Sequence, residues 1–259
     1  MKVVIFAGGL GTRLMEETEA RPKPMVEIGG KPILWHIMKM YSSYGFNDFV
    51  LCLGYKQNMI RDFFINYYYH NTDITIDLEN NITEIHKSNS ENFKVTLVNT
   101  GLLTNTAGRL KKVQKYVGNE SFMLTYGDGV SDIDISKLVE FHESHKRLVT
   151  ITSVRVPGRF GNLHFDETGK VQNFIEKPIG DGVWINGGFM VIRPEVFNYL
   201  EGDMDAIQWE KGPMAAIAQD NEMMTYQHFG FWKCMDALRD KIELEDLWNS
   251  GHAPWKTWS

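Results

Sequence analysis

Six short apolar runs, rich in β-branched and aromatic residues, are spaced along the chain, and each has the length of a β-strand. They lie at residues 3–7, 49–53, 95–98, 122–126, 149–154 and 189–192. Most lack alternating polar residues, which is typical of strands that are buried on both faces. Helical patterns separate them, at residues 31–44, 58–69, 108–117, 135–145 and 237–248. This alternation predicts an α/β fold with a mostly parallel central sheet and helices on both of its faces.

The sequence contains no internal repeat, low-complexity segment or linker, so residues 1–259 are predicted to form a single domain. Two segments depart from the strand and helix alternation. Residues 70–94 are polar with short alternating apolar pieces, which predicts an inserted hairpin-like segment, either a surface loop or an oligomer contact. Residues 249–259 form an aromatic C-terminal tail that either docks on its own core or contacts another subunit.

Charge and composition exclude several classes of protein. The 259 residues carry 27 Lys and Arg against 33 Asp and Glu, a net charge of −6 without any basic block, which argues against nucleic-acid binding. No apolar run approaches the roughly 20 residues that cross a bilayer, and the N-terminal run is too short for a signal peptide. Cys52 and Cys234 stand far apart in apolar surroundings and are predicted to be reduced thiols. We therefore expect a cytoplasmic protein without a membrane or nucleic-acid partner.

The first predicted strand leads into a glycine-rich turn, AGGLGTRL at residues 7–14. Glycines let the backbone come close to a ligand and point its N–H groups at phosphate oxygens, and Arg13 can bind phosphate through its guanidinium. A tight turn without a ligand is the alternative. The run is not the dinucleotide fingerprint of a dehydrogenase, because Leu14 stands where the last glycine belongs, and it lacks the Gly-Lys-Ser/Thr end of a P-loop.

Lys23 follows shortly after this turn, between Pro22 and Pro24. Rigid proline neighbours hold the ammonium in place, which suits a positive charge directed at phosphate. A solvated lysine in an extended turn is the alternative. The position of Lys23 soon after the glycine-rich turn favours the phosphate-binding role.

Two carboxylates are candidate metal ligands. Asp128 lies between Gly127 and Gly129 at the end of a strongly apolar strand, and Mg²⁺ usually binds one or two carboxylates together with substrate phosphates. A turn aspartate that bonds only to the backbone is the alternative. Asp236 precedes the last predicted helix and is either the second ligand or a plain N-cap.

Weaker signals lie elsewhere in the chain. Thr104 and Arg109 belong to TNTAGR, which precedes a helix and suits an anion at the helix start. Lys177, in Glu-Lys-Pro, is a candidate for binding a second phosphate, and Asn186 with Gly187 for contacting the hydroxyl groups of a sugar. A surface ion pair and an ordinary turn are the alternatives at these two places.

Six motifs taken together resemble the sugar nucleotidyltransferases, which make NDP-sugars from an NTP and a sugar 1-phosphate. The motifs are AGGLGTRL (7–14), PKPM (22–25), GD (127–128), EKP (176–178), NGG (186–188) and the element from Trp232 to Asp236. Their order and spread cover essentially the whole chain. Longer stretches are similar to the subgroup that uses CTP, at residues 24–41, 125–130, 157–161, 185–189 and 253–258. Phe6 and Arg21 are mild departures from the family's usual residues.

The resemblance implies a Rossmann-like mixed sheet of the nucleotide-diphospho-sugar transferase type. It also implies that CTP and α-D-glucose 1-phosphate give CDP-glucose and diphosphate, with Mg²⁺ as cofactor, for the synthesis of dideoxysugars in surface polysaccharide such as the O-antigen of lipopolysaccharide. The subgroup is oligomeric, so a homo-oligomer is implied, and specifically a hexamer.

The resemblance also assigns roles to individual residues. Asp128 and Asp236 would bind the metal, Lys177 the sugar phosphate, and Asn186 and Gly187 the glucose. The implied nucleotide-binding residues are Phe6, Ala7, Gly8, Gly9, Leu10, Gly11, Thr12, Arg13, Lys23, Thr104 and Arg109.

Such a reaction needs no general base, because the attacking sugar phosphate is already an anion. Its catalysts are therefore expected to be charged groups that act by positioning and charge stabilisation, namely Arg13, Lys23, Asp128 and Asp236. His36 belongs to an amphipathic helix and is predicted to be a core or rim residue. Two other functions remain open, a nucleotidyltransferase that uses UTP, dTTP or GTP, and a non-catalytic regulatory subunit that binds nucleotide sugars.

Overall fold

The computed structural model describes residues 1–86, 91–156, 162–175 and 183–258. The strands are β1 (Val3–Ala7), β2 (Glu27–Ile28), β3 (Lys31–Pro32), β4 (Asp48–Leu53), β5 (Ile74–Asp77), β6 (Ile82–Ile85), β7 (Lys94–Asn99), β8 (Phe122–Tyr126), β9 (Gly129–Ser131), β10 (Val149–Val154), β11 (Asn162–Phe165), β12 (Val171–Ile175), β13 (Ile185–Ile192), β14 (Met223–His228) and β15 (Trp232–Cys234). The α-helices are α1 (Met15–Thr18), α2 (Ile33–Ser43), α3 (Gln57–Ile65), α4 (Tyr67–His70), α5 (Thr106–Val117), α6 (Ile135–His145), α7 (Pro213–Gln219) and α8 (Leu238–Asn249). Short 3₁₀ helices are η1 (Thr12–Leu14), η2 (Lys23–Met25) and η3 (Pro194–Tyr199).

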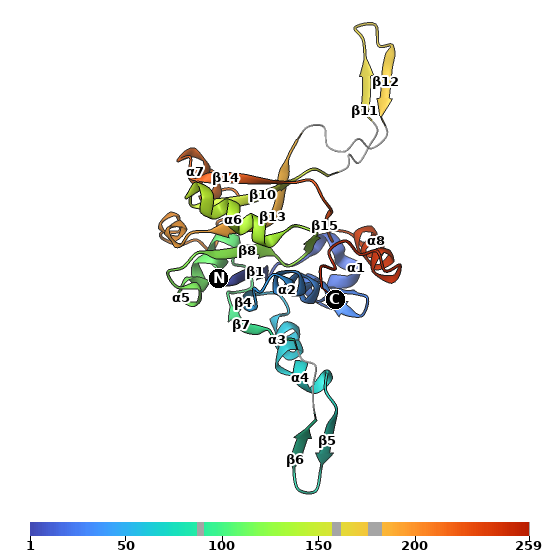
Figure 1. Ribbon diagram of the computed structural model, residues 1–259, viewed down its shortest axis with the longest axis vertical. Coiled ribbons are helices and arrows are strands. Elements are labelled where there is room, and N and C mark those ends of the chain that lie inside the picture. Colours follow the sequence, from blue (N-terminus) through green and yellow to red (C-terminus); the bar gives the residue numbers. More distant parts are fainter. Residues whose placement is uncertain (87–90, 157–161, 176–182, 259) are drawn as a thin grey trace.

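The central sheet has seven strands in the order β14-β10-β13-β8-β1-β4-β7 (Figure 1). β1 is parallel to β4 and to β8, β4 is parallel to β7, and β10 is parallel to β14. β13 runs antiparallel to both of its neighbours, β8 and β10. The sheet is therefore mixed and mostly parallel, which confirms the predicted fold class.

All six predicted strands are present, and five agree with the structure to within one residue at each end. The exception is β13, which begins at Ile185, well before the predicted start at residue 189. Asn186, Gly187 and Gly188 suggested a turn, but here they belong to the strand. An irregularity in the pairing opposite Ile151 and Ser153 accommodates them, as β-bulges commonly do.

Three of the predicted helices have boundaries that differ by two residues or more in the structure, and one of them, predicted at 108–117, begins at Thr106. The pattern at 31–44 forms a helix only from Ile33, because Pro32 is extended, with ψ of 143°, and pairs with Glu27 in the β2–β3 ribbon. The pattern at 58–69 is divided at Asn66 into α3 and α4. The helix predicted at 31–44 ends at Ser43, within one residue of its predicted end, and Gly45 follows it with a left-handed φ of 85°.

Apolar cores lie on both faces of the sheet, and β1 contributes to each of them. Its residues Val3 and Ile5 pack into the core that α2 covers, whereas Val4 and Phe6 pack into the core that α5 covers. This is why the strand is an unbroken apolar run, since a residue facing either way meets other side chains. The end of β1 is thereby held rigidly where the glycine-rich turn begins.

Two hairpins project from opposite ends of the molecule (Figure 1). One is β5–β6, within the polar segment 70–94, and the other is β11–β12. Ile74 pairs with Ile85 and Ile76 with Thr83, so these side chains share one face of the β5–β6 hairpin. Ile74, Ile76 and Ile85 are exposed there, as is Leu78 in the turn, which is 89% exposed.

The aromatic tail packs on the body of its own chain. Trp255 is fully buried, stacks against Phe231 and Trp248, and directs its indole N–H at Nδ1 of His36, 3.4 Å away. His36 is also fully buried and hydrogen-bonds the Ile28 carbonyl through Nε2 at 2.8 Å. Burial lowers the pKa of His36 to about 4, so the imidazole is neutral and belongs to the core, as predicted.

Within the described ranges, no helix combines the length and the apolar character needed to cross a membrane.

Candidate functional site

A pocket opens where β1 and β8 end, at the carboxyl edge of the parallel strands where ligands collect in such sheets. It brings together the glycine-rich turn, Lys23, Thr104, Arg109 and Asp128, which lie far apart in the sequence. Its lining residues are Phe6, Ala7, Gly8, Gly9, Gly11, Thr12, Lys23, Pro24, Thr104, Asn105, Thr106, Arg109, Tyr126, Gly127 and Asp128. Leu10, in the middle of the turn, is directed to solvent and is 46% exposed.

Arg109 in α5 fastens the glycine-rich turn to the neighbouring loop. Its buried guanidinium donates hydrogen bonds to the carbonyls of Gly8 (2.9 Å), Leu53 (3.1 Å) and Leu102 (3.3 Å) and to the hydroxyl of Thr100 (2.6 Å). Burial lowers the pKa of Arg109, but an arginine remains charged in proteins. The resemblance implies a nucleotide contact for this residue. In the structure it borders the pocket, and its donors hold the protein backbone in place.

Gly8 leaves the space that this arrangement needs. A Cβ atom there would lie 2.2 Å from Nη1 of Arg109 and 2.9 Å from the backbone nitrogen of Gly54. A Cβ on Gly9, by contrast, would meet no atom within 4 Å. Gly11 has a left-handed φ of 67° and leads into the 3₁₀ turn that starts at Thr12. The three glycines therefore have different roles: close packing at Gly8, an open face at Gly9 and backbone geometry at Gly11.

The ammonium of Lys23 bridges two carboxylates. Its Nζ lies 2.6 Å from an oxygen of Asp128 and 2.6 Å from an oxygen of Asp236. Burial of Lys23 disfavours its charge, but the charge of Asp128 and the hydrogen bonds to both aspartates outweigh this and raise the pKa of Lys23. The rigid backbone after Pro22 leads into the 3₁₀ turn that carries the lysine. The prolines thus hold a charged group in place, as the sequence suggested, and in this structure its partners are carboxylates.

A small ribbon brings the two aspartates together from sequence positions far apart. β9 and β15 pair antiparallel with Gly129 opposite Cys234, and the amide of Met235 donates to the Asp128 carbonyl at 2.8 Å. Asp236 follows β15, and its carboxylate contacts Lys23. The backbone N–H groups of Asp236 and Ala237 bond instead to the carboxylate of Asp240, at 3.0 and 2.9 Å. Asp240 thereby provides the helix-capping carboxylate, so the N-cap alternative for Asp236 is not what the structure shows.

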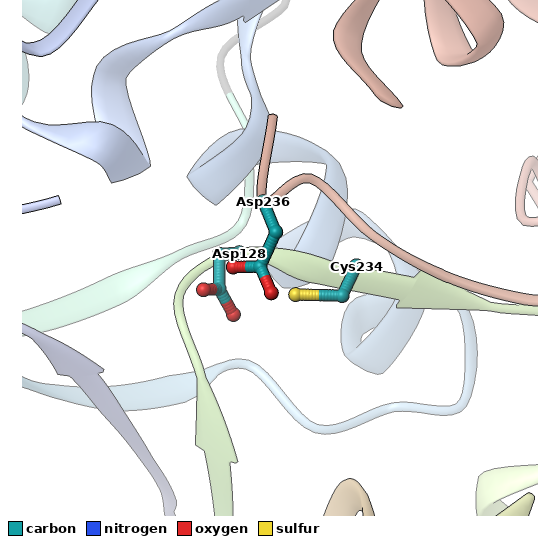
Figure 2. Close-up of side chains that lie close together, drawn as sticks. All are labelled: Asp128, Cys234 and Asp236. Carbon is teal, nitrogen blue, oxygen red and sulfur yellow. The ribbon is translucent and has the colours of Figure 1, made fainter. Parts of the chain in front are cut away.

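Cys234 stands beside this pair of carboxylates, and the sequence analysis did not assign it to the site. Asp128, Cys234 and Asp236 each offer one ligand atom, and these atoms all lie within 4.8 Å of one another (Figure 2). Burial and the neighbouring Asp128 raise the pKa of the Cys234 thiol. Its spacing from Asp236 was a usable signal, because residues two apart in an extended segment point the same way. The two carboxylates fit a divalent cation, and the thiol is a possible third ligand.

Tyr126 and Glu210 are further residues at the site to which the sequence motifs gave no role. The Tyr126 hydroxyl, at the end of β8, donates to Glu210 at 2.6 Å and lies 3.5 Å from the amide nitrogen of Asn186. Burial raises the pKa of Tyr126, so its hydroxyl keeps its proton. The Gly187 carbonyl accepts a hydrogen bond from the indole of Trp232 at 2.7 Å. The structure therefore places Asn186 next to Tyr126 in the wall of the pocket, whereas Gly187 contacts Trp232, which is not among the described lining residues.

Thr104 and Thr106 lie where α5 begins, beside the pocket. Lys112 donates to the Thr104 hydroxyl at 3.0 Å, and that hydroxyl lies 3.3 Å from a carboxylate oxygen of Asp205. The Thr106 hydroxyl donates to Glu210 at 2.9 Å. Two predicted site residues cannot be placed: Lys177 and the side chain of Arg13 lie outside the described part of the chain.

The fold and the pocket together define an α/β nucleotide-binding enzyme, with a glycine-rich turn and paired carboxylates at the carboxyl edge of a mixed sheet. The family model for nucleotidyl transferases matches residues 2–235, so the chain belongs to the nucleotidyltransferase family, whose members generally use a divalent metal.

Individual relatives agree with this family. The chain is 53% identical over 259 residues to the glucose-1-phosphate cytidylyltransferase of Salmonella typhi, and the match covers all of both chains. It is equally similar, 53% identical with full coverage of both chains, to the enzyme of that name from Salmonella typhimurium. Among solved structures, a UTP-bound UGPase from Acinetobacter baumannii has a TM-score of 0.70 at 17% identity, covering 98% of this chain and 95% of the other. That last likeness shows the fold.

The packing around the glycine-rich turn predicts different costs for alanine at its first two glycines. Gly8→Ala is expected to lower the free energy of unfolding by about 1–3 kcal/mol, because the added methyl group overlaps the guanidinium of Arg109. Gly9→Ala is the matched control and should change it by less than about 0.5 kcal/mol. Urea unfolding of the ligand-free variants measures both values. Equal stability of the two variants would contradict this account of the turn.

Proposed function

We propose that this protein is a glucose-1-phosphate cytidylyltransferase, which converts CTP and α-D-glucose 1-phosphate into CDP-glucose and diphosphate. The observation that carries the proposal is the Lys23, Asp128 and Asp236 cluster beside the glycine-lined pocket, in a chain that is 53% identical to cytidylyltransferases along its full length. The product would serve dideoxysugar synthesis for surface polysaccharide.

The reaction is an in-line displacement at the α-phosphorus of CTP. An oxygen of glucose 1-phosphate forms the new P–O bond, the bond to the β-phosphate oxygen breaks, and its electron pair leaves with diphosphate. The nucleophile is already an anion, so no proton has to be removed from it. The work of the protein is therefore to position the two substrates and to offset their charge.

Charge repulsion is the main obstacle to this reaction. Each pair of unit charges about 4 Å apart repels by about 4 kcal/mol at an effective dielectric near 20, and both substrates carry several negative charges. Lys23, together with Arg13 and Lys177, supplies the positive charge on the protein. The backbone N–H groups of the glycine-rich turn offer phosphates further donors.

Asp128 and Asp236 would hold Mg²⁺, which usually takes one or two carboxylates together with substrate phosphates and neutralises phosphate charge when bound. Lys23 keeps these two carboxylates close together against their mutual repulsion. Thr104, Arg109 and residues 6–13 would contact the nucleotide, and Asn186 with Gly187 the glucose. Arg109 would act by holding the Gly8 carbonyl, and hence the turn, in position.

The charged groups of the cluster should be needed for turnover, and Lys23 and Asp128 are the two to test first. Lys23→Ala and Asp128→Asn are each expected to lower kcat by roughly 10² or more, which is the usual cost of removing one preorganised electrostatic group. Lys115→Ala, which removes an exposed cation on α5, is the control and should leave kcat unchanged. Steady-state diphosphate release measures these rates, and circular dichroism shows whether the variants are folded. A near-normal rate for either site variant would remove that residue from the mechanism.

The choice of CTP rests on the full-length relatives, and a rival enzyme would use UTP, dTTP or GTP. Diphosphate release with each of the four NTPs and glucose 1-phosphate, with and without Mg²⁺, tests the proposal directly. We expect CTP to be preferred and activity to disappear in excess chelator. A preference for UTP would overturn the assignment of the base, full activity in chelator would overturn the metal, and binding without turnover would indicate a regulatory subunit.

We also propose that the chain is a homo-oligomer, a hexamer by its family resemblance, with the β5–β6 hairpin as a subunit contact. A two-stranded hairpin is marginally stable in water when nothing covers it. Its Ile74, Ile76 and Ile85 form an exposed apolar face, with Leu78 beside it in the turn. A second copy of the chain would bury that face and stabilise the ribbon.

The two faces of the hairpin offer a matched test of the subunit contact. Ile76→Lys should lower the molar mass in solution, measured by light scattering, because it places a charge on the apolar face. Thr75→Lys places the same charge on the opposite face and should leave the mass unchanged. A monomeric wild-type protein, or an unchanged oligomer in the Ile76 variant, would exclude this contact.

A further inference from the structure

We propose that Glu210 is a positioning residue for the sugar substrate. It fixes the proton of the Tyr126 hydroxyl, so that this hydroxyl accepts a hydrogen bond from a hydroxyl group of the sugar. Tyr126 lines the pocket, whereas Glu210 is not among the described residues that line it and acts through the tyrosine. The inference rests on the proposed function and deepens it, because it identifies how the pocket would recognise a hexose.

The segment that precedes Glu210 is fastened to the beginning of α5. The amide of Asn105 donates to the Asp205 carbonyl at 2.7 Å. The amide of Trp209, a fully buried residue, donates to the Thr106 hydroxyl at 2.7 Å. The Glu210 carboxylate is thereby held beside the first turn of α5, where the free N–H groups of a helix favour a negative charge.

This carboxylate accepts two hydrogen bonds, from the hydroxyl of Tyr126 at 2.6 Å and from that of Thr106 at 2.9 Å. A tyrosine hydroxyl has a single proton, and a carboxylate can only accept. Burial and the charge of Glu210 raise the pKa of Tyr126, so the proton stays on the phenol. Because that proton is directed at Glu210, the remaining lone pairs of the Tyr126 oxygen can only accept a hydrogen bond from a ligand.

The ring of Tyr126 is also confined. Gly188 has a left-handed φ of 84°, and a Cβ atom there would lie 2.8 Å from Cδ2 of the tyrosine. The ring of Phe6 is a second neighbour, with its centroid 5.9 Å from that of Tyr126. Packing therefore sets the position of the hydroxyl oxygen, and Glu210 sets the direction of its proton.

The place of this hydroxyl in the sheet indicates which substrate it meets. β8 lies between β1 and β13, and the glycine-rich turn follows β1. The Tyr126 oxygen lies 3.5 Å from the amide nitrogen of Asn186 in β13, on the opposite side of β8 from that turn. If the turn holds the nucleotide, the β13 side is left for the hexose of the second substrate, whose hydroxyl groups are hydrogen-bond donors.

The test uses analogues of glucose 1-phosphate in which fluorine replaces one hydroxyl group at a time. Fluorine is similar in size to a hydroxyl but cannot donate a hydrogen bond. The wild-type enzyme is expected to lose about tenfold or more in kcat/KM, measured by diphosphate release, when the hydroxyl that contacts Tyr126 is replaced, because its oxygen would then face another acceptor.

Two variants should remove this discrimination. Tyr126→Phe removes the acceptor, and Glu210→Met removes the partner of the phenol proton, which can then turn toward the ligand. Each should lose less than about threefold with the same analogue, the range of a single neutral hydrogen bond. The double variant should match Tyr126→Phe alone, because both changes act through one hydroxyl. Glu120→Met, at an exposed carboxylate, is the control and should discriminate as the wild type does.

A ratio of rates with two sugars separates positioning from mere support of the fold, because a structural defect lowers the rates with all sugars equally. Such an equal fall, unchanged discrimination in Glu210→Met or Tyr126→Phe, or a wild type that tolerates fluorine at every position would overturn the proposal. If Glu210→Met is unfolded by circular dichroism, Glu210→Gln replaces it and leaves one acceptor for two donors. A wild type that releases no diphosphate with any NTP would overturn the proposed function as well, whereas the other results leave that function standing.

Discussion

The bridge from Lys23 to Asp128 and Asp236 is the interaction on which the candidate site depends. It joins three parts of the chain, since its partners lie 105 and 213 residues away from the lysine in sequence. At the observed 2.6 Å, each ion pair attracts by roughly 6 kcal/mol at an effective dielectric near 20, before the cost of desolvation. Oxygens of the two carboxylates lie within 4.8 Å of each other, and two negative charges at that distance repel by roughly 3 kcal/mol in the same medium. The ammonium therefore makes it possible to hold both carboxylates together in the ligand-free protein.

Arg109 is a second buried cation, and it fixes the backbone around the pocket as Lys23 fixes the two carboxylates. Arg109 spreads its donors over the Gly8, Leu53 and Leu102 carbonyls, which belong to three separate segments that converge beside the pocket. Buried carbonyl groups require such partners, and a planar guanidinium can serve several of them at once. The absence of a side chain on Gly8 lets the guanidinium approach closely. The glycine-rich turn is thus shaped by a residue about 100 positions further along the chain.

The sequence was sufficient for the fold and for part of the site, and the reasons differ from residue to residue. β1 and β8 were predictable because strands buried on both faces are unbroken apolar runs. Asp128 was predictable because a carboxylate between glycines at the end of such a strand reaches the ligand edge of the sheet. Glu210 was not, because its position depends on hydrogen bonds from Tyr126 and Thr106, which lie far from it in the sequence. The beginning of β13 was missed because Gly187 and its neighbours are residues typical of turns. The β-bulge that keeps them in the strand has no signature of its own in the sequence.

The chain has a net negative charge, yet its proposed substrates are anions. The arrangement of the cations at the pocket shows how such substrates could still bind. Among the described residues that line it, the charged cations are Lys23 and Arg109. The first is paired with two carboxylates and the second with carbonyl groups, so neither offers its full charge to a phosphate. A divalent cation held by Asp128 and Asp236 would compensate those carboxylates in place of Lys23 and leave its ammonium available to a phosphate. The pairing of Lys23 is therefore a physical reason why a divalent cation at these carboxylates would favour the binding of phosphates in this pocket.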